Sequence, residues 1–135
     1  MKYKPVERVI TVEFIETSNG TGYDIRVTPD EIVARHNDIL VWDVQGLPES
    51  KAKKLAFGNF VQVFGSGRVA FGKKGFAPAR PRLIPNDDVA VAATSKGFRA
   101  KLELGPAEPG FYKYDIKSEG ATLLDPDIEI RGPRN

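Results

Sequence analysis

The residues that bind soft metals and carry thiol chemistry are almost missing from this chain. Of its 135 residues none is Cys, the only His is His36, and the only Met is Met1. The absence of Cys excludes disulfides, thiolate metal sites and thiol catalysis. A site that needs several imidazoles is also excluded, since His36 stands alone.

Long apolar runs are missing as well. No stretch approaches the ~20 apolar residues that a membrane-spanning helix needs, so we expect no membrane-spanning segment. No secretory apolar region precedes the first strand-like run. The chain as it stands is therefore expected to be cytoplasmic, or exported if a signal has been removed, and its compartment stays open.

Length and composition are typical of one globular domain. With 41% apolar and 28% charged residues, the chain is neither disordered nor membranous by composition. A chain of 135 residues can bury one two-layer core. We expect a single domain covering residues 1–135, with residues 45–86 as a long insertion or loop region within it.

Apolar residues alternate with polar ones, which is the period of β-strands. Ile10, Val12 and Phe14 share one face, and residues 23–27 return as a second alternating strand after a turn. Short strands separated by Gly and Pro turns indicate a sandwich or barrel. One short helix is expected over Glu49–Ala56. The other expected strands are 39–44, 60–64, 68–71, 89–93, 99–104, 111–117 and 127–131.

Two blocks of the sequence resemble the cupredoxin family. Residues 110–116, Gly-Phe-Tyr-Lys-Tyr-Asp-Ile, resemble the family's Gly-x-Tyr-x-(aromatic)-x-Cys run, and residues 37–42 and 46–49 resemble the strand and Gly-Phe-Pro-His that deliver its first imidazole. The resemblance implies an all-β, two-sheet Greek-key sandwich, cupredoxin-like. It also implies that all four copper-ligand positions are replaced, since they hold Glu49, Ile116, Glu119 and Leu124.

The vacated ligand positions allow two interpretations. Glu49 and Glu119 would converge at one end of the sandwich, where two carboxylates could bind a hard cation or share a proton with a raised pKa. Ile116 and Leu124 would line the rest of that pocket and offer no ligands. We therefore favour aliphatic packing with both Glu side chains turned to water. No copper, other metal or cofactor is expected.

The remaining titratable groups give weaker signals. Asp125, Asp127 and Glu129 alternate, so they could form a weak Ca²⁺ site but fit the solvated face of a strand better. His36 beside Asp38 could act as a general base, but no nucleophile motif accompanies it. His36 is better explained as an exposed turn residue, and we expect no enzymatic activity.

Charge is distributed unevenly along the chain. The net charge is only +2, yet residues 51–82, hereafter the basic segment, hold eight basic residues and no Asp or Glu. The segment also carries Phe and Gly residues, a combination that suits stacking on a polyanion. Its lysines could equally form a solvated rim or recognise an acidic protein. The candidate contact residues are Lys51, Lys53, Lys54, Arg68, Lys73, Lys74, Arg80 and Arg82.

Three hypotheses remain. The first, which we favour, is a metal-free cupredoxin-like domain that binds a protein partner, associates with itself or serves as a structural subunit, using the basic segment as its contact surface. The second is nucleic-acid or other polyanion binding through the same segment. The third is an enzyme or hard-metal site using Glu49 and Glu119. Salt-dependent affinity for nucleic acid separates the first hypothesis from the second. The third predicts a strongly perturbed carboxylate pKa or stoichiometric metal binding.

Overall fold

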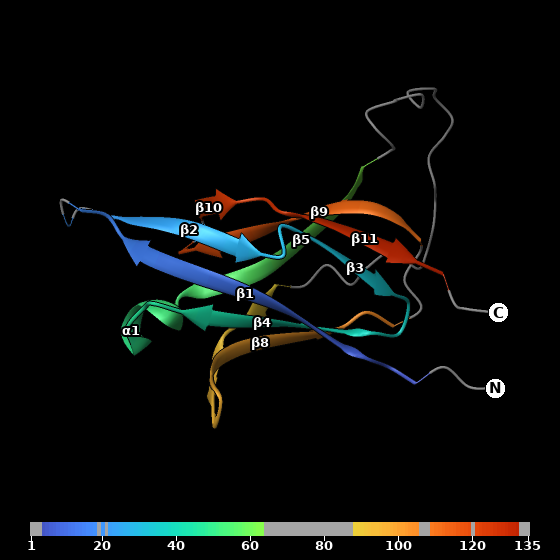
Figure 1. The fold of residues 1–135 in the computed structure, drawn as a ribbon, viewed down its shortest axis with the longest axis horizontal. Coiled ribbons are helices and arrows are strands. Elements are labelled where there is room, and N and C mark those ends of the chain that lie inside the picture. Colours follow the sequence, from blue (N-terminus) through green and yellow to red (C-terminus); the bar gives the residue numbers. More distant parts are fainter. Residues whose placement is uncertain are drawn as a thin grey trace.

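The chain folds into strands and one short helix (Figure 1). The computed structural model describes residues 4–18, 20, 22–63, 88–105, 109–119 and 121–132, with the backbone alone at residue 63. Within these ranges the elements are β1 (Glu7–Glu16), β2 (Tyr23–Thr28), β3 (Glu31–Arg35), β4 (Ile39–Gln45), α1 (Glu49–Ala52), β5 (Leu55–Val63), β6 (Val89–Ala90), β7 (Ala92–Thr94), β8 (Gly97–Glu103), β9 (Gly110–Ser118), β10 (Ala121–Leu124) and β11 (Asp127–Arg131).

The strands form two sheets that pack face to face. The first sheet has the order β2-β1-β4-β8-β7, and the second has the order β3-β11-β9-β5-β6 with β10 paired to β9. β1 lies parallel to β4, and β3 lies parallel to β11, because the chain passes between the sheets several times. This arrangement confirms the predicted all-β, two-sheet sandwich. Helix α1 lies at one end of it, and β11 finishes at the other (Figure 1).

The core fills the space between the sheets. The alternation in β1 buries Ile10, Val12 and Phe14, as predicted. The centre is aromatic: the Trp42 ring of β4 stacks on Phe57 of β5 at 4.8 Å between centroids, with the planes 6° apart. Offset aromatic pairs of this kind add stability beyond their buried area.

The central strand predicted at residues 39–44 is confirmed, because β4 is the middle strand of the first sheet.

Some boundaries differ from the predictions. The helix expected over Glu49–Ala56 ends at Ala52, because Leu55 begins β5 and is buried against the core. Within the expected insertion 45–86, residues 55–63 therefore form a core strand of the second sheet. Val61, in that strand, has 53% of its surface exposed because it faces outward.

The single strand expected over residues 89–93 is in fact two short ones. β6 pairs with β5 in the second sheet, whereas β7 pairs with β8 in the first. Val91 lies between them and is buried, so the chain crosses from one sheet to the other at this residue. In the part of the chain that the structure describes, no helix is long and apolar enough to cross a membrane.

Candidate functional site

The four positions that resemble copper-ligand positions have different surroundings. Ile116 of β9 is fully buried, as expected for aliphatic packing. Leu124 of β10 pairs with Ile116 in the sheet register but is 37% exposed. The pairing of β10 with β9 shifts register between Thr122 and Leu124, and all four residues of β10 are exposed. Leu123, which sequence reasoning missed, lines the cleft at this end of the sandwich.

The two carboxylates at this end each have a lysine partner. Glu49 opens α1 and pairs with Lys53 one turn later, at 2.8 Å between Oε2 and Nζ. Glu119, in the turn after β9, pairs with Lys54 at 2.9 Å. The hydrogen bond and charge of Lys53 lower the pKa of Glu49, whereas sharing a proton would raise it. Both Glu side chains are exposed, so their surroundings match solvated ion pairs better than a proton-sharing pair.

No metal centre is formed by the described parts of the chain. Within residues 4–63 and 88–132, apart from the gaps already given, no group of three or more His, Asp or Glu side chains is placed to hold a metal ion. The alternating acids of β11 face outward and have partners: Asp127 pairs with Lys113 at 2.7 Å and Glu129 with Arg131 at 3.2 Å. These contacts match the solvated strand face favoured from the sequence.

A cleft opens between the two sheets beside α1. Its volume is about 350 Å³, near the lower end of the ~300–1,000 Å³ typical of ligand pockets. Phe14 of β1 and Leu55 of β5 are buried and form its floor. Its remaining lining residues are Tyr23, Ile25, Leu47, Lys51, Lys54, Ser118, Glu119 and Leu123. The cleft is therefore apolar inside and carries charged side chains from α1 and the turns.

The chain reaches the cleft through a tight bend after β4. Gly46 has a φ of +90°, and a Cβ at this position would overlap the carbonyl oxygen of Phe14. Glycine is needed here because it adopts positive φ without strain and allows close backbone approach. The bend places Leu47 beside the cleft and directs the chain into α1.

Lys51 differs from the other lysines of α1 and its following turn. Its Nζ lies 5.2 Å from the centroid of the Tyr23 ring, within the range of a cation–π contact. Among the described residues, no Asp or Glu forms an ion pair with Lys51, whereas Lys53 and Lys54 each have one. The charged residues that line the cleft are Lys51, Lys54 and Glu119, which together give a formal charge of +1.

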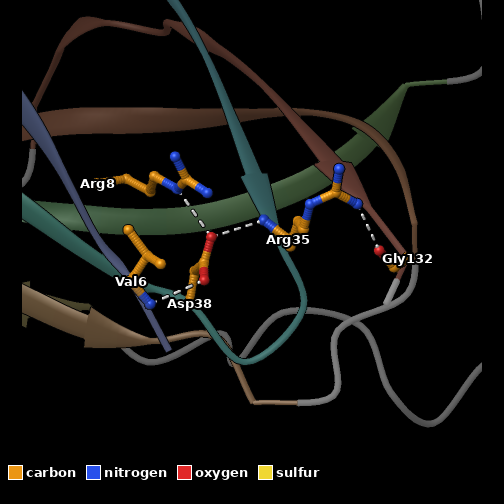
Figure 2. Close-up of polar contacts among 5 residues, drawn as sticks. All are labelled: Val6, Arg8, Arg35, Asp38 and Gly132. Carbon is orange, nitrogen blue, oxygen red and sulfur yellow. Dashed lines mark hydrogen bonds and ion pairs between the residues drawn. The ribbon is translucent and has the colours of Figure 1, made fainter. Parts of the chain in front are cut away.

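A buried carboxylate joins four segments at the opposite end of the sandwich (Figure 2). Asp38 is fully buried, and its Oδ2 accepts hydrogen bonds from Arg8 Nε at 2.8 Å and from the Arg35 backbone N–H at 2.9 Å. Its Oδ1 accepts one from the backbone N–H of Val6 at 3.0 Å. Arg35 in turn donates to the carbonyl of Gly132 at 3.1 Å. The cluster ties β1, β3, β4 and the end of β11 together.

The hydrogen bonds of this cluster give Asp38 a structural role. His36 lies in the same turn and is half-buried, and its backbone N–H donates to the Arg131 carbonyl at 3.0 Å. The Asp38 carboxylate accepts hydrogen bonds from the Arg8 guanidinium and from the backbone N–H groups of Val6 and Arg35. His36 thus lies in the expected turn but is half-buried rather than exposed.

The basic segment falls only partly within the described residues. Lys51, Lys53 and Lys54 are exposed on α1 and the turn after it. The other candidate contact residues, Arg68, Lys73, Lys74, Arg80 and Arg82, lie outside the described residues.

Comparisons with known proteins found similarity in structure only. No protein-family model matches the sequence, and no curated protein matches it. Among solved structures, the chain is similar to the oxidised form of plastocyanin from Dryopteris crassirhizoma, with 13% sequence identity over 92% of this chain and 100% of that one, at a TM-score of 0.45.

Proposed function

We propose that this domain works without copper as a protein-interaction or structural module, with its contact surface in the basic segment. The observation that carries this proposal is the exposure of α1 at the end of the sandwich. Ala52 is buried and anchors the helix, while Lys51, Lys53 and Lys54 remain exposed. A rigid sandwich that presents a charged connection is a common basis for recognition.

The chemistry of the partner follows from the charge of this surface. Lys53 and Lys54 are offset by nearby glutamates, so Lys51 is the cation of α1 with no such offset among the described residues. The sequence adds five more basic residues between 55 and 82 and no acidic ones. An acidic protein surface complements such a charge distribution and would associate faster at low salt.

The test compares two triple charge reversals. Lys51, Lys73 and Lys74 are replaced by Glu in one variant, and Lys4, Lys96 and Lys101, which are exposed elsewhere, are replaced in the control. Each protein is cross-linked in extract at physiological salt, and its own association is followed by analytical ultracentrifugation. A partner, or a second copy, held by the wild type and the control but lost from the first variant supports the proposal. Identical behaviour of all three proteins contradicts it.

Polyanion binding is the second candidate because the same basic residues could neutralise phosphates. Fluorescence anisotropy with short labelled single-stranded RNA and DNA separates it from protein binding. Binding that persists at physiological salt and falls in the Lys73/Lys74 charge reversal would favour a nucleic-acid function. Binding at low salt only would be nonspecific attraction to the basic segment.

A further inference from the structure

We propose that the cleft beside α1 binds a small organic monoanion with an apolar body, such as a medium-chain or aromatic carboxylate. The inference goes beyond the protein-interaction function and does not depend on it. It rests on three features of the described residues: an apolar interior between the sheets, a single uncompensated cation at the opening, and a volume suited to a small molecule.

The interior of the cleft is apolar because apolar side chains from both sheets line it. Phe14 is 6% exposed and Leu55 is 3% exposed, and both border the cleft. Ile25 and Leu47 form further parts of the wall, and Leu123 at the rim is 40% exposed. An apolar ligand body would remove these side chains from water, which is favourable in proportion to the area covered.

The charges at the opening favour an anion over a cation or a neutral ligand. Lys54 and Glu119 offset each other at 2.9 Å, so this pair offers little net charge to a ligand. Lys51 carries the remaining charge and lies over the Tyr23 ring, which keeps its ammonium group beside the apolar wall. A carboxylate placed at the opening could accept a charge-assisted hydrogen bond from Lys51 while its apolar body fills the interior.

The cleft size sets an upper limit on the ligand. A volume of about 350 Å³ suits a ligand of roughly ten to twelve heavy atoms, given ~30 Å³ for each water-sized volume. Binding should therefore tighten by about fourfold for each methylene that becomes buried, since one methylene is worth about 0.8 kcal/mol. The increase should stop once the cleft is full.

The experiment titrates the full chain with hexanoate, octanoate and decanoate, below their micelle concentrations. Affinity is measured by calorimetry, and the site is located by amide chemical-shift changes in two-dimensional NMR. We expect saturable one-to-one binding that tightens along the series, with shifts at Tyr23, Lys51 and Leu123 and none at His36. Acetate should not bind detectably, and octyltrimethylammonium should bind more weakly than octanoate.

Two matched pairs of variants test the assignment. Lys51→Gln should weaken octanoate binding by about three- to tenfold because it removes the uncompensated cation. Lys53→Gln, at the residue that follows the helix and does not line the cleft, should leave binding unchanged. Leu123→Asp should weaken binding and Leu124→Asp should not, although the two residues are neighbours with similar exposure. All four residues are exposed, so the variants should fold, which circular dichroism checks.

Three results would overturn the proposal. The first is no saturable binding of octanoate or decanoate. The second is equal weakening by Lys51→Gln and Lys53→Gln, which would mean a diffuse attraction to the lysines. The third is equal affinity for octanoate and octyltrimethylammonium, which would mean that the cleft recognises apolar chains regardless of charge.

Discussion

Trp42 and Tyr114 connect the two sheets through one hydrogen bond. The indole Nε1 of Trp42, on β4 of the first sheet, donates to the hydroxyl oxygen of Tyr114, on β9 of the second, at 3.0 Å. Both side chains are almost fully buried, and their rings lie 5.4 Å apart in an edge-to-face contact. Buried polar groups are expensive unless paired, so each of these side chains depends on the other.

Replacing Tyr114 by Phe should therefore destabilise the domain. The indole N–H would lose its acceptor in the core, and we expect the free energy of unfolding to fall by about 1–3 kcal/mol. Urea unfolding followed by Trp42 fluorescence measures the change. Tyr23→Phe is the matched control, because no hydrogen bond of the Tyr23 hydroxyl is found among the described residues. Equal losses in both variants would contradict the role of the hydrogen bond.

The same tyrosine should make stability depend on alkaline pH. Burial raises the pKa of Tyr114 from 10.0 to about 12, although the Trp42 hydrogen bond acts in the opposite direction. The folded state thus holds the proton more tightly than the unfolded chain, so this contribution is complete below about pH 10 and is lost as the pH rises toward 12. The slope should reach at most about 1.4 kcal/mol per pH unit.

The test of this pH dependence compares the free energy of unfolding of the wild type with that of the Tyr114→Phe variant. Urea unfolding of the wild type and of Tyr114→Phe is measured at several pH values between 9 and 12. Lysine titration affects both proteins, so the difference in stability reports Tyr114. We expect the free energy of unfolding of the wild type to fall relative to that of Tyr114→Phe above about pH 10. A constant difference across this range would show that the buried phenol does not titrate with a raised pKa.

Asp38→Asn should be among the more damaging single changes in the domain. It keeps the volume but replaces one accepting oxygen by an NH₂ donor that faces N–H groups, and it removes the charge that pairs with Arg8. We expect the free energy of unfolding, measured in urea, to fall by about 2–4 kcal/mol. Glu13→Gln, which breaks the exposed pair with Arg26, should cost less than about 1 kcal/mol. Similar losses would show that burial of Asp38 has no special effect.

Gly46 should not tolerate a side chain. Gly46→Ala would place a Cβ against the Phe14 carbonyl and force a positive φ on a non-glycine residue. Gly97→Ala isolates the second effect, since Gly97 has a φ of +110° but open space around it. In urea unfolding, we expect Gly97→Ala to lower the free energy of unfolding by about 1–2 kcal/mol. Gly46→Ala should lower it by a further ~1–3 kcal/mol because of the overlap. Equal losses would mean that the backbone beside Gly46 moves aside freely.

Added Cu²⁺ should not produce a blue-copper centre. Such a site needs a thiolate and two imidazoles, and the chain has no Cys and one His. Titration with Cu²⁺ should give no intense thiolate-to-copper absorption band in the visible range. Weak binding at His36 is the expected background, and His36→Gln should remove it. An intense blue band would contradict the prediction.

Much of the fold is visible in the periodicity of the sequence. The alternation of Ile10, Val12 and Phe14 identified the buried face of β1, and the apolar run at 39–44 identified a central strand. Local patterns reveal these features because a strand exposes alternate side chains to opposite faces. The division of residues 89–93 between two sheets was not visible, since the hydrogen-bond partners of β6 and β7 come from distant strands.

The candidate site was predicted less well than the fold. The glutamates at positions 49 and 119 were singled out from the sequence, but the pairing of Glu119 with Lys54 depends on how the turn after α1 meets the β9–β10 turn. Leu123 rather than Leu124 lines the cleft, and the pairing of β10 with β9 is irregular between Thr122 and Leu124. A sequence pattern that assumes a regular strand cannot detect such a shift.

The amino-acid sequence by itself determined the chemistry that this protein lacks and the class of its fold. A chain without Cys and with one His has no blue-copper ligand set in any conformation, and alternating apolar residues favour a sandwich. Only the tertiary structure decided where the remaining groups meet. Asp38 became a buried acceptor for Arg8 and two backbone N–H groups. The cleft with Lys51 at its opening arose where several strands and α1 converge, because contacts between distant segments depend on packing.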